Sequence, residues 1–197
     1  MHFTLADLVT DIAQNAFESK ATLVELELRE EGNEFRFLVK DNGKGMSKAV
    51  LDRAIDPFVT DGIKHPHRKV GLGLPFLIQT AEQSGGGWDI QSEEGKGTTV
   101  TAWFDTGNVD MPPVGDLPVM LRTILMFEGP EGVSPDVVIR RSRHQDAGHQ
   151  DAGHQESVPP LDYEIRKSEL AEALGGLEDA GSLVLLGEYL RSLEDDE

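Results

Sequence analysis

The sequence predicts an α+β fold: a two-layer sandwich with helices on one face of a mixed β-sheet, followed by a small α/β appendage. Apolar residues repeat at helical spacing near the N-terminus, whereas two later pairs of segments alternate apolar and polar residues. These segments occur in the order helix, two strands, helix, loop, helix, two strands. A stretch rich in Pro and Gly, 106–116, then predicts a linker between a core domain, 1–105, and an appendage, 117–197.

The core elements follow from local patterns. Thr4 is a suitable N-cap for a first helix over about 4–19, and a hairpin is expected from the alternation in 24–28 and 35–39. Ser47 can cap a short helix that runs to about Ile55, and a longer helix is expected from 71 to 84. Residues 88–92 and 98–104 complete the core as two further strands.

The second part carries weaker patterns. We expect a helix within 115–127, strands at 137–141 and 161–165 that pair, and helices at 168–176 and 183–193. Between the strands, a repeated DAGHQ segment falls in a stretch, 142–160, that we interpret as a flexible loop. Its evenly spaced histidines also suit a metal site, but nothing nearby provides the supporting shell that such sites need.

Composition excludes several classes of partner. The net charge is −18, and it is uneven: residues 1–104 hold 11 Lys and Arg against 16 Asp and Glu, whereas 105–197 hold 7 against 20. Such an excess of negative charge repels phosphate backbones and anionic lipids, so neither nucleic acid nor a membrane is expected as a partner. The chain has no cysteine, no apolar run of membrane-spanning length and no signal-peptide pattern, and we expect a soluble, cytoplasmic protein.

Three short segments are candidates for chemistry. Asp11 and Asn15 lie one helical turn apart, where an amide oxygen can hold Mg²⁺, although the pair equally fits a solvated face. Asp41 opens DNGKGM directly after a buried strand, where a carboxylate requires a donor such as an exocyclic amine; a tight turn is the alternative. The glycines of VGLGLP (70–75) open a helix whose first amides attract anions, or they serve packing alone.

Together these segments resemble a known family. The set DIAQNA (11–16), DNGKGM (41–46), DPF (56–58), VGLGLP (70–75) and GKGTTVT (95–101) resembles the Bergerat ATP-binding fold shared by gyrase, the ninety-kilodalton heat-shock chaperone, histidine kinases and MutL. The resemblance covers about residues 1–104, and the order of its motifs is most similar to the ATP-binding domain of histidine kinases.

The resemblance implies a role for each matching residue. Asn15 would ligate Mg²⁺, Asp41 would bind the adenine amino group, and Thr99, or its neighbour Thr98, would support the adenine through Asp41 and water. Gly43 and Gly45 would form the turn that faces the nucleotide. The end of a mobile lid over the ATP phosphates would be formed by Gly71, Leu72, Gly73 and Leu74.

The lid itself would span the residues between Thr60 and Val70. It contains Lys64, Arg68 and Lys69, which are suited to neutralise a triphosphate, although each is equally consistent with a solvated loop. Lys64 is the candidate that we assign to the nucleotide.

One departure from the family bears on catalysis. Asp11 stands where gyrase-type members carry a glutamate that activates water. A carboxylate one methylene shorter would miss that water by roughly 1 Å, which costs on the order of a hundredfold in rate. Asp11 is therefore the candidate catalytic residue of a slow enzyme.

We expect an ATP- and Mg²⁺-binding protein that acts as a stand-alone kinase or slow ATPase on a partner protein. The alternative is a regulatory module that binds ATP without hydrolysing it. None of the six histidines is followed directly by an acidic residue, as is typical of a phosphoacceptor, so we expect any acceptor to lie on another chain.

Overall fold

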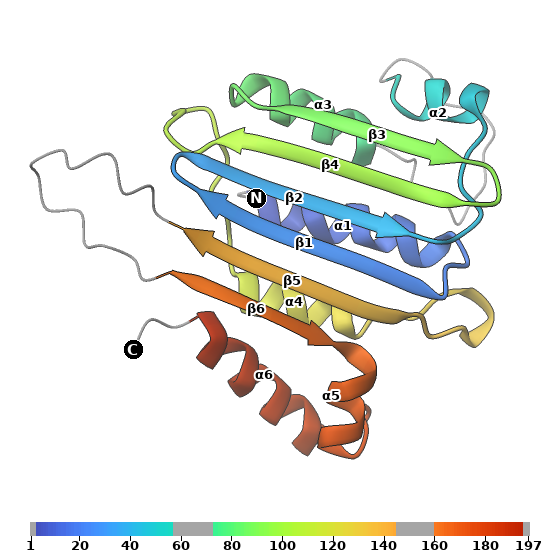
Figure 1. The fold of residues 1–197 in the computed structure, drawn as a ribbon, viewed down its shortest axis with the longest axis vertical. Coiled ribbons are helices and arrows are strands. Elements are labelled where there is room, and N and C mark those ends of the chain that lie inside the picture. The colour runs from blue at the N-terminus through green and yellow to red at the C-terminus, as the bar shows by residue number, and fades with distance from the viewer. Residues whose placement is uncertain (1–2, 57–72, 145–159, 195–197) are drawn as a thin grey trace, which may run out of the picture.

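A single six-stranded sheet organises the chain. The computed structural model describes residues 3–56, 73–144 and 160–194. The strand order is β3-β4-β2-β1-β5-β6. Helices α1, α3 and α4 cover one face of this sheet, and the opposite face faces the viewer in Figure 1. The predicted α+β class with helices on one face is confirmed.

The first half follows the predicted order of elements. Helix α1 (Leu5–Glu18) begins with a capping box in which Thr4 and Asp7 bond each other's backbone amides. Strands β1 (Leu23–Glu31) and β2 (Glu34–Asp41) form the expected antiparallel hairpin. Helix α2 (Lys48–Ala54), helix α3 (Gly73–Gln83) and the antiparallel strands β3 (Gly87–Glu93) and β4 (Gly97–Asp105) complete it.

The second half adds to the same sheet. After helix α4 (Leu117–Leu125) and a 3-10 turn (Pro130–Gly132), strand β5 (Asp136–His144) pairs in parallel with β1. Strand β6 (Leu161–Arg166) pairs with β5, as predicted, and helices α5 (Lys167–Leu174) and α6 (Ala180–Glu194) follow. The division into two domains stays a prediction, but no break in the sheet accompanies it. The expected flexible loop falls largely on residues outside the described ranges.

The two halves also share contacts outside the sheet. The carbonyls of Pro113 and Val114 accept hydrogen bonds from the first two amides of α1, 3.0 and 2.8 Å long, which a helix cannot satisfy internally. Phe17 of α1 packs edge-to-face on Phe127, which follows α4, with ring centroids 5.3 Å apart. The predicted linker is thus part of the N-terminal cap of α1.

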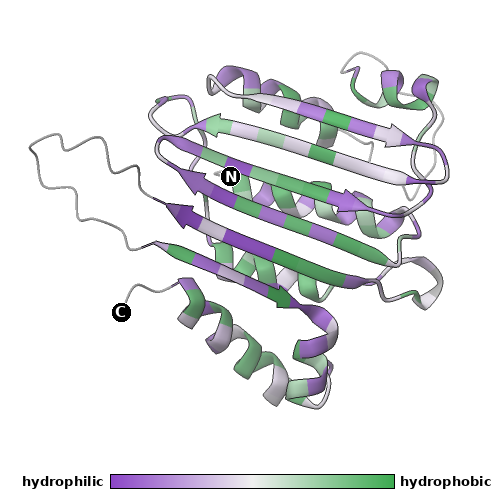
Figure 2. Ribbon diagram, viewed as in Figure 1, coloured by the Kyte–Doolittle hydropathy of each residue, from purple (hydrophilic) through white to green (hydrophobic). Residues whose placement is uncertain are grey.

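The apolar core lies between the sheet and its helices. In Figure 2 hydrophobic and hydrophilic residues alternate along much of β1, and its buried and less buried residues alternate in the same way, which is the period-two pattern of a sheet with one solvated face. On that face Arg140 bonds Glu25 and Glu164, on the strands either side of it. The other face supplies fully buried side chains such as Leu26, Phe37 and Ile139.

One buried cation ties the last helix to the sheet. Arg141 is only 1% exposed and forms ion pairs with Glu30 of β1 and Glu194 of α6. The hydroxyl of Tyr163 also donates to Glu194, at 2.6 Å. Burial raises the pKa of Tyr163, and its bond to the Glu194 carboxylate adds to that rise. Within the described ranges, no helix combines the length and apolar character needed to cross a membrane.

Candidate nucleotide site

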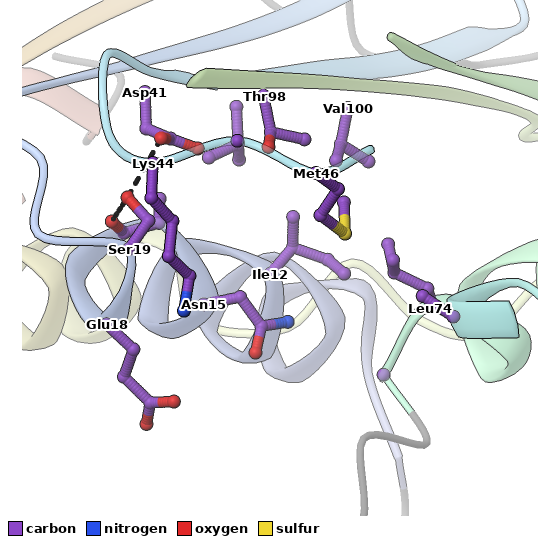
Figure 3. Close-up of a pocket in the computed structure, with 15 residues that line it drawn as sticks. Ile12, Asn15, Glu18, Ser19, Asp41, Lys44, Met46, Leu74, Thr98 and Val100 are labelled. Atoms are coloured by element: carbon purple, nitrogen blue, oxygen red, sulfur yellow. Dashed lines mark hydrogen bonds between the residues drawn. The ribbon is translucent and has the colours of Figure 1, made fainter. Parts of the chain in front are cut away.

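A cavity of about 290 Å³ lies between α1, the DNGKGM loop, the ends of β2 and β4, and the start of α3 (Figure 3). Its size is near the lower end of the range for small-molecule sites. The cavity is lined by Ile12, Asn15, Ala16, Glu18, Ser19, Val39, Asp41, Lys44, Gly45, Met46, Ala54, Gly73, Leu74, Thr98 and Val100. Three segments singled out in the sequence, around Asn15, Asp41 and Gly73, therefore meet at one cavity.

Asp41 provides the buried acid of this cavity. It is 7% exposed, and its Oδ1 accepts hydrogen bonds from the Gly43 amide (2.8 Å) and the Ser19 hydroxyl (2.9 Å). Burial raises the pKa of Asp41 above its ordinary value, although these two donors and the Thr98 backbone oppose the rise. Both of these hydrogen bonds use Oδ1, which leaves acceptor capacity on the carboxylate for a donor within the cavity.

Hydrogen bonds fix the loop that carries Asp41. The Asn42 side chain accepts from the amides of Thr22 and Leu23, at 2.9 and 3.0 Å, and so ties the loop to the start of β1. The Met46 amide donates to the Ser92 hydroxyl of β3, at 2.8 Å. The loop is held from both sides, so the position of Asp41 does not depend on a ligand.

The glycines of this loop are required by protein contacts. A Cβ on Gly43 would lie 1.8 Å from the Ser19 Oγ, and a Cβ on Gly45 would lie 2.0 Å from the Glu93 carbonyl oxygen. Gly45 also has φ +60, a conformation that favours glycine. Gly45 lines the cavity whereas Gly43 does not. That Gly43 and Gly45 form a turn facing the nucleotide stays a prediction, and neighbouring protein atoms already fill the space beside each glycine.

Of the two threonines proposed to support the adenine, Thr98 lines the cavity and Thr99 does not. Asp41 pairs with Thr98 across the β2–β4 ladder, and Thr98 lines the cavity with Val100, two residues on. Side chains on a strand alternate between faces, so Thr99 belongs to the opposite face. Thr98 bonds Ser92, with 2.9 Å between their hydroxyl oxygens. Of the two threonines considered, Thr98 is the one placed beside Asp41.

The two polar candidates on α1, Asp11 and Asn15, differ in their position relative to the cavity. Asn15 is exposed and lines the cavity, and a Cβ placed on Gly73 would lie 3.7 Å from its Nδ2. Leu74, the next residue after Gly73, also lines the cavity. Asp11 is exposed one turn before Asn15 and is not among the lining residues. The remaining candidates, Lys64, Gly71 and Leu72, lie outside the described residues, as does most of the expected lid.

Several lining residues were not expected from the sequence. Ser19 bonds Asp41, while Lys44 and Glu18 carry charge at the cavity. An apolar wall of the kind that accommodates a planar aromatic ring is formed by Ile12, Val39, Met46, Leu74 and Val100. Strand alternation was the available signal for Val39 and Val100. Nothing local in the sequence indicates that Ser19 would meet Asp41, because 22 positions separate them.

The oxygen ligands at the cavity suit a divalent ion only if that ion is bound together with a polyphosphate. Across the part of the chain that is described, no group of three or more His, Cys, Asp or Glu residues could hold a metal. Asn15 offers a carboxamide oxygen at the cavity. Mg²⁺ retains water and substrate phosphates around a small number of protein oxygens, so a site with one amide oxygen fits Mg²⁺ bound together with a polyphosphate.

Comparison with known proteins decides the family. Residues 3–108 match the family model described as histidine kinase-, DNA gyrase B- and HSP90-like ATPase, which is more than half of the chain. The chain belongs to this ATPase family. Thus the resemblance read from the five motifs is confirmed. The match ends before α4, so the segment that supplies β5 and β6 lies beyond it.

Similar curated proteins of the ATPase family are sensor kinases. The chain is 28% identical over 113 residues to the sensor histidine kinase ZraS of Escherichia coli (strain K12), covering 56% of this chain and 23% of that protein. It is 33% identical over 110 residues to an uncharacterized sensor-like histidine kinase of Rhizobium meliloti (strain 1021), covering 54% of this chain and 21% of that protein. The chain therefore spans less than a quarter of the length of either relative.

A solved structure is also similar. The catalytic domain of the histidine kinase ThkA matches with a TM-score of 0.39 and 20% identity, over 50% of this chain and 64% of that chain.

Proposed function

We propose that this chain binds ATP with Mg²⁺ in the cavity between α1 and the DNGKGM loop, and that it acts as a stand-alone kinase or slow ATPase on a partner protein. The observation that carries the proposal is Asp41: a buried carboxylate, fixed by Ser19 and Gly43, in a cavity with apolar walls. Membership of the ATPase family supports the nucleotide; the acceptor and the stand-alone role belong to the proposal alone.

Asp41 supports adenine over guanine. The adenine amino group is a donor and meets a carboxylate acceptor, whereas the oxygen at the same position of guanine is an acceptor and would be repelled. The apolar wall provided by Ile12, Met46 and Val100 favours a flat ring over water. Thr98, adjacent to Asp41 in the ladder, is the residue that supports the adenine in this proposal.

Asn15 supports the phosphate end. Its carboxamide lies on α1, across the cavity from Asp41 in Figure 3, close to where α3 begins at Gly73. Asn15 would hold Mg²⁺ together with the phosphate oxygens, and the ion would supply charge neutralisation when bound. Gly73 and Leu74 would lie beside the same phosphates, at the end of the lid.

The position of Asp11 supports slow hydrolysis of ATP. The carboxylate is exposed and does not line the cavity. A general base must approach the proton it removes, directly or through one water molecule, so this placement gives water little activation. Catalysis would then depend on positioning and charge, as in phosphoryl transfer generally.

The same observation favours a second candidate function. If Asp11 activates no water at all, the chain is a module that binds ATP and changes its affinity for a partner without hydrolysing it. In that case the affinity for the partner depends on which nucleotide is bound. The effect of an enzyme on its partner would depend instead on turnover of ATP.

Incubation with γ-labelled ATP separates the two functions. The chain is incubated alone and with cell extract, beside Asp41→Asn as a variant impaired in binding and Asp11→Ala as a variant that tests whether this carboxylate contributes to catalysis. Released phosphate or a labelled protein that is lost with Asp41→Asn supports the enzyme, and the placement of Asp11 predicts only a small loss with Asp11→Ala. Binding of ATP with neither product supports the module, and an Asp41→Asn variant as active as the wild type refutes the site.

A further inference from the structure

The lining of the cavity carries too little positive charge to balance the phosphates of ATP. Among the described lining residues, Asp41 and Glu18 are acidic and Lys44 alone is basic. A nucleoside triphosphate carries several negative charges, and Mg²⁺ offsets two of them. The chain as a whole has a net charge of −18, so its long-range field opposes the ligand as well. A cationic side chain within the cavity would therefore stabilise the bound phosphates more than any other lining group.

Lys44 is held with its backbone fixed. Its amide donates to the Ser19 carbonyl at 2.9 Å, and its carbonyl accepts from the Gly95 amide at 2.7 Å. One bond ties Lys44 to the end of α1 and the other to the β3–β4 turn. In Figure 3 its side chain extends from the loop toward α1, to the side of the cavity where Asn15 lies and away from Asp41. The ammonium group is thus directed to the wall opposite the buried acid.

We propose that Lys44 is a phosphate-binding residue of this site, which contacts the nucleotide from the loop rather than from the lid. This inference rests on the proposed function, because it places Lys44 relative to a nucleotide whose base is held by Asp41. Asp41 and Lys44 are three positions apart on one rigid loop. The loop would therefore fix the base with the first residue and the phosphate chain with the second.

Glu18 provides a test of the proposal, because removing its charge should change the affinity for ATP in the opposite direction from removing the charge of Lys44. It lines the same cavity from α1, and Gln14 Nε2 donates to its Oε1 at 3.2 Å. A carboxylate near the phosphates repels them, whereas an ammonium group attracts them, so removing each charge has opposite effects on ATP. Neither removal changes the affinity for adenosine, which carries no phosphate.

Calorimetric titration of ATP, ADP, AMP and adenosine into three variants tests the proposal. Lys44→Met removes the ammonium group and keeps most of the side-chain length, and Glu18→Gln removes the opposite charge. Lys48→Met is the matched control, because Lys48 lies four residues on, is 87% exposed, pairs with Asp52 and does not line the cavity. Circular dichroism checks that each variant is folded.

We expect Lys44→Met to weaken ATP at least tenfold, the size of a lost charge-assisted hydrogen bond, and to change adenosine less than twofold. Glu18→Gln should tighten ATP about two- to fivefold, and Lys48→Met should match the wild type. The shortest nucleotide affected by Lys44→Met identifies the phosphate that is bound.

Equal weakening of ATP and adenosine would overturn the proposal, because it would place Lys44 at the base. Unchanged ATP affinity in Lys44→Met would also overturn it while leaving ATP binding itself intact. A wild-type chain that binds none of the four ligands refutes the proposed function first, and the inference with it.

Discussion

Replacing Arg141 tests how firmly the last helix is joined to the sheet. Arg141→Met keeps an unbranched side chain but removes the partner of Glu194, which is only 8% exposed. Loss of one member of a buried ion pair costs about 3 to 5 kcal/mol. Glu194 keeps its bond from Tyr163, and Glu30, 30% exposed, can turn to water. We therefore expect a loss near the lower end, about 3 kcal/mol in the free energy of unfolding.

Urea unfolding followed by circular dichroism measures this loss. With a slope of about 2 kcal/mol per molar urea, the midpoint should fall by about 1.5 M. Arg140→Met is the matched control, since Arg140 is the preceding residue of β5, lies on the opposite face and is 41% exposed. Its ion pairs are of the surface kind, so it should cost under about 1 kcal/mol.

A second substitution separates charge from packing. Adding Glu194→Gln to Arg141→Met removes the buried carboxylate, so part of the lost stability should return. A single Arg141→Met variant within about 0.5 kcal/mol of the wild type would refute the reasoning, because mutations away from buried networks have effects of that size. Equal losses for Arg140 and Arg141 would refute it as well.

Three further predictions concern the nucleotide site. Asn15→Ala should abolish the tightening of ATP binding by Mg²⁺, whereas Gln14→Ala, on the preceding residue, should not; equal Mg²⁺ dependence in both variants would reassign the ion. Adenosine affinity should rise with pH through the raised pKa of Asp41 and then level off, because only the ionised carboxylate accepts fully from the amino group. An adenosine affinity that does not change between acidic and neutral pH would contradict this. Ser19→Ala should weaken adenosine about threefold to tenfold by removing a donor to Asp41, at 2.9 Å, and wild-type affinity would show that Gly43 positions the carboxylate alone.

Local patterns predicted the helices and strands but not every neighbour in the sheet. Thr4, the alternation in β1 and β2, and the expected pairing of β5 with β6 all correspond to observed features. The parallel pairing of β5 with β1 was not predicted. Strands far apart in sequence can be placed side by side by the packing of α1 on α4, and no periodicity within either strand encodes that choice.

Site residues that belong to a sequence motif could be predicted. Residues that reach the cavity only through the packing of distant segments could not. Asp41 and Asn15 both reach the cavity, as the motifs suggested. Of the two threonines that the motif offered, Thr98 lines the cavity and Thr99 does not, because a shift of one residue on a strand moves a side chain to the other face. Ser19 and Lys44 were missed, since their place at the cavity depends on how α1 meets the loop after β2.

Titration of ATP and GTP into the wild type and Asp41→Asn is the most direct test of the central claim, that Asp41 holds an adenine nucleotide. Asn keeps the size of the side chain and an oxygen for Gly43 and Ser19, so the fold should survive while an acceptor toward the base is lost. We expect the wild type to bind ATP and not GTP, and Asp41→Asn to bind ATP at least a hundredfold more weakly, roughly the loss expected for an unmatched buried polar group. Equal ATP affinity in a folded Asp41→Asn variant, or wild-type binding of GTP as tight as ATP, would contradict the claim.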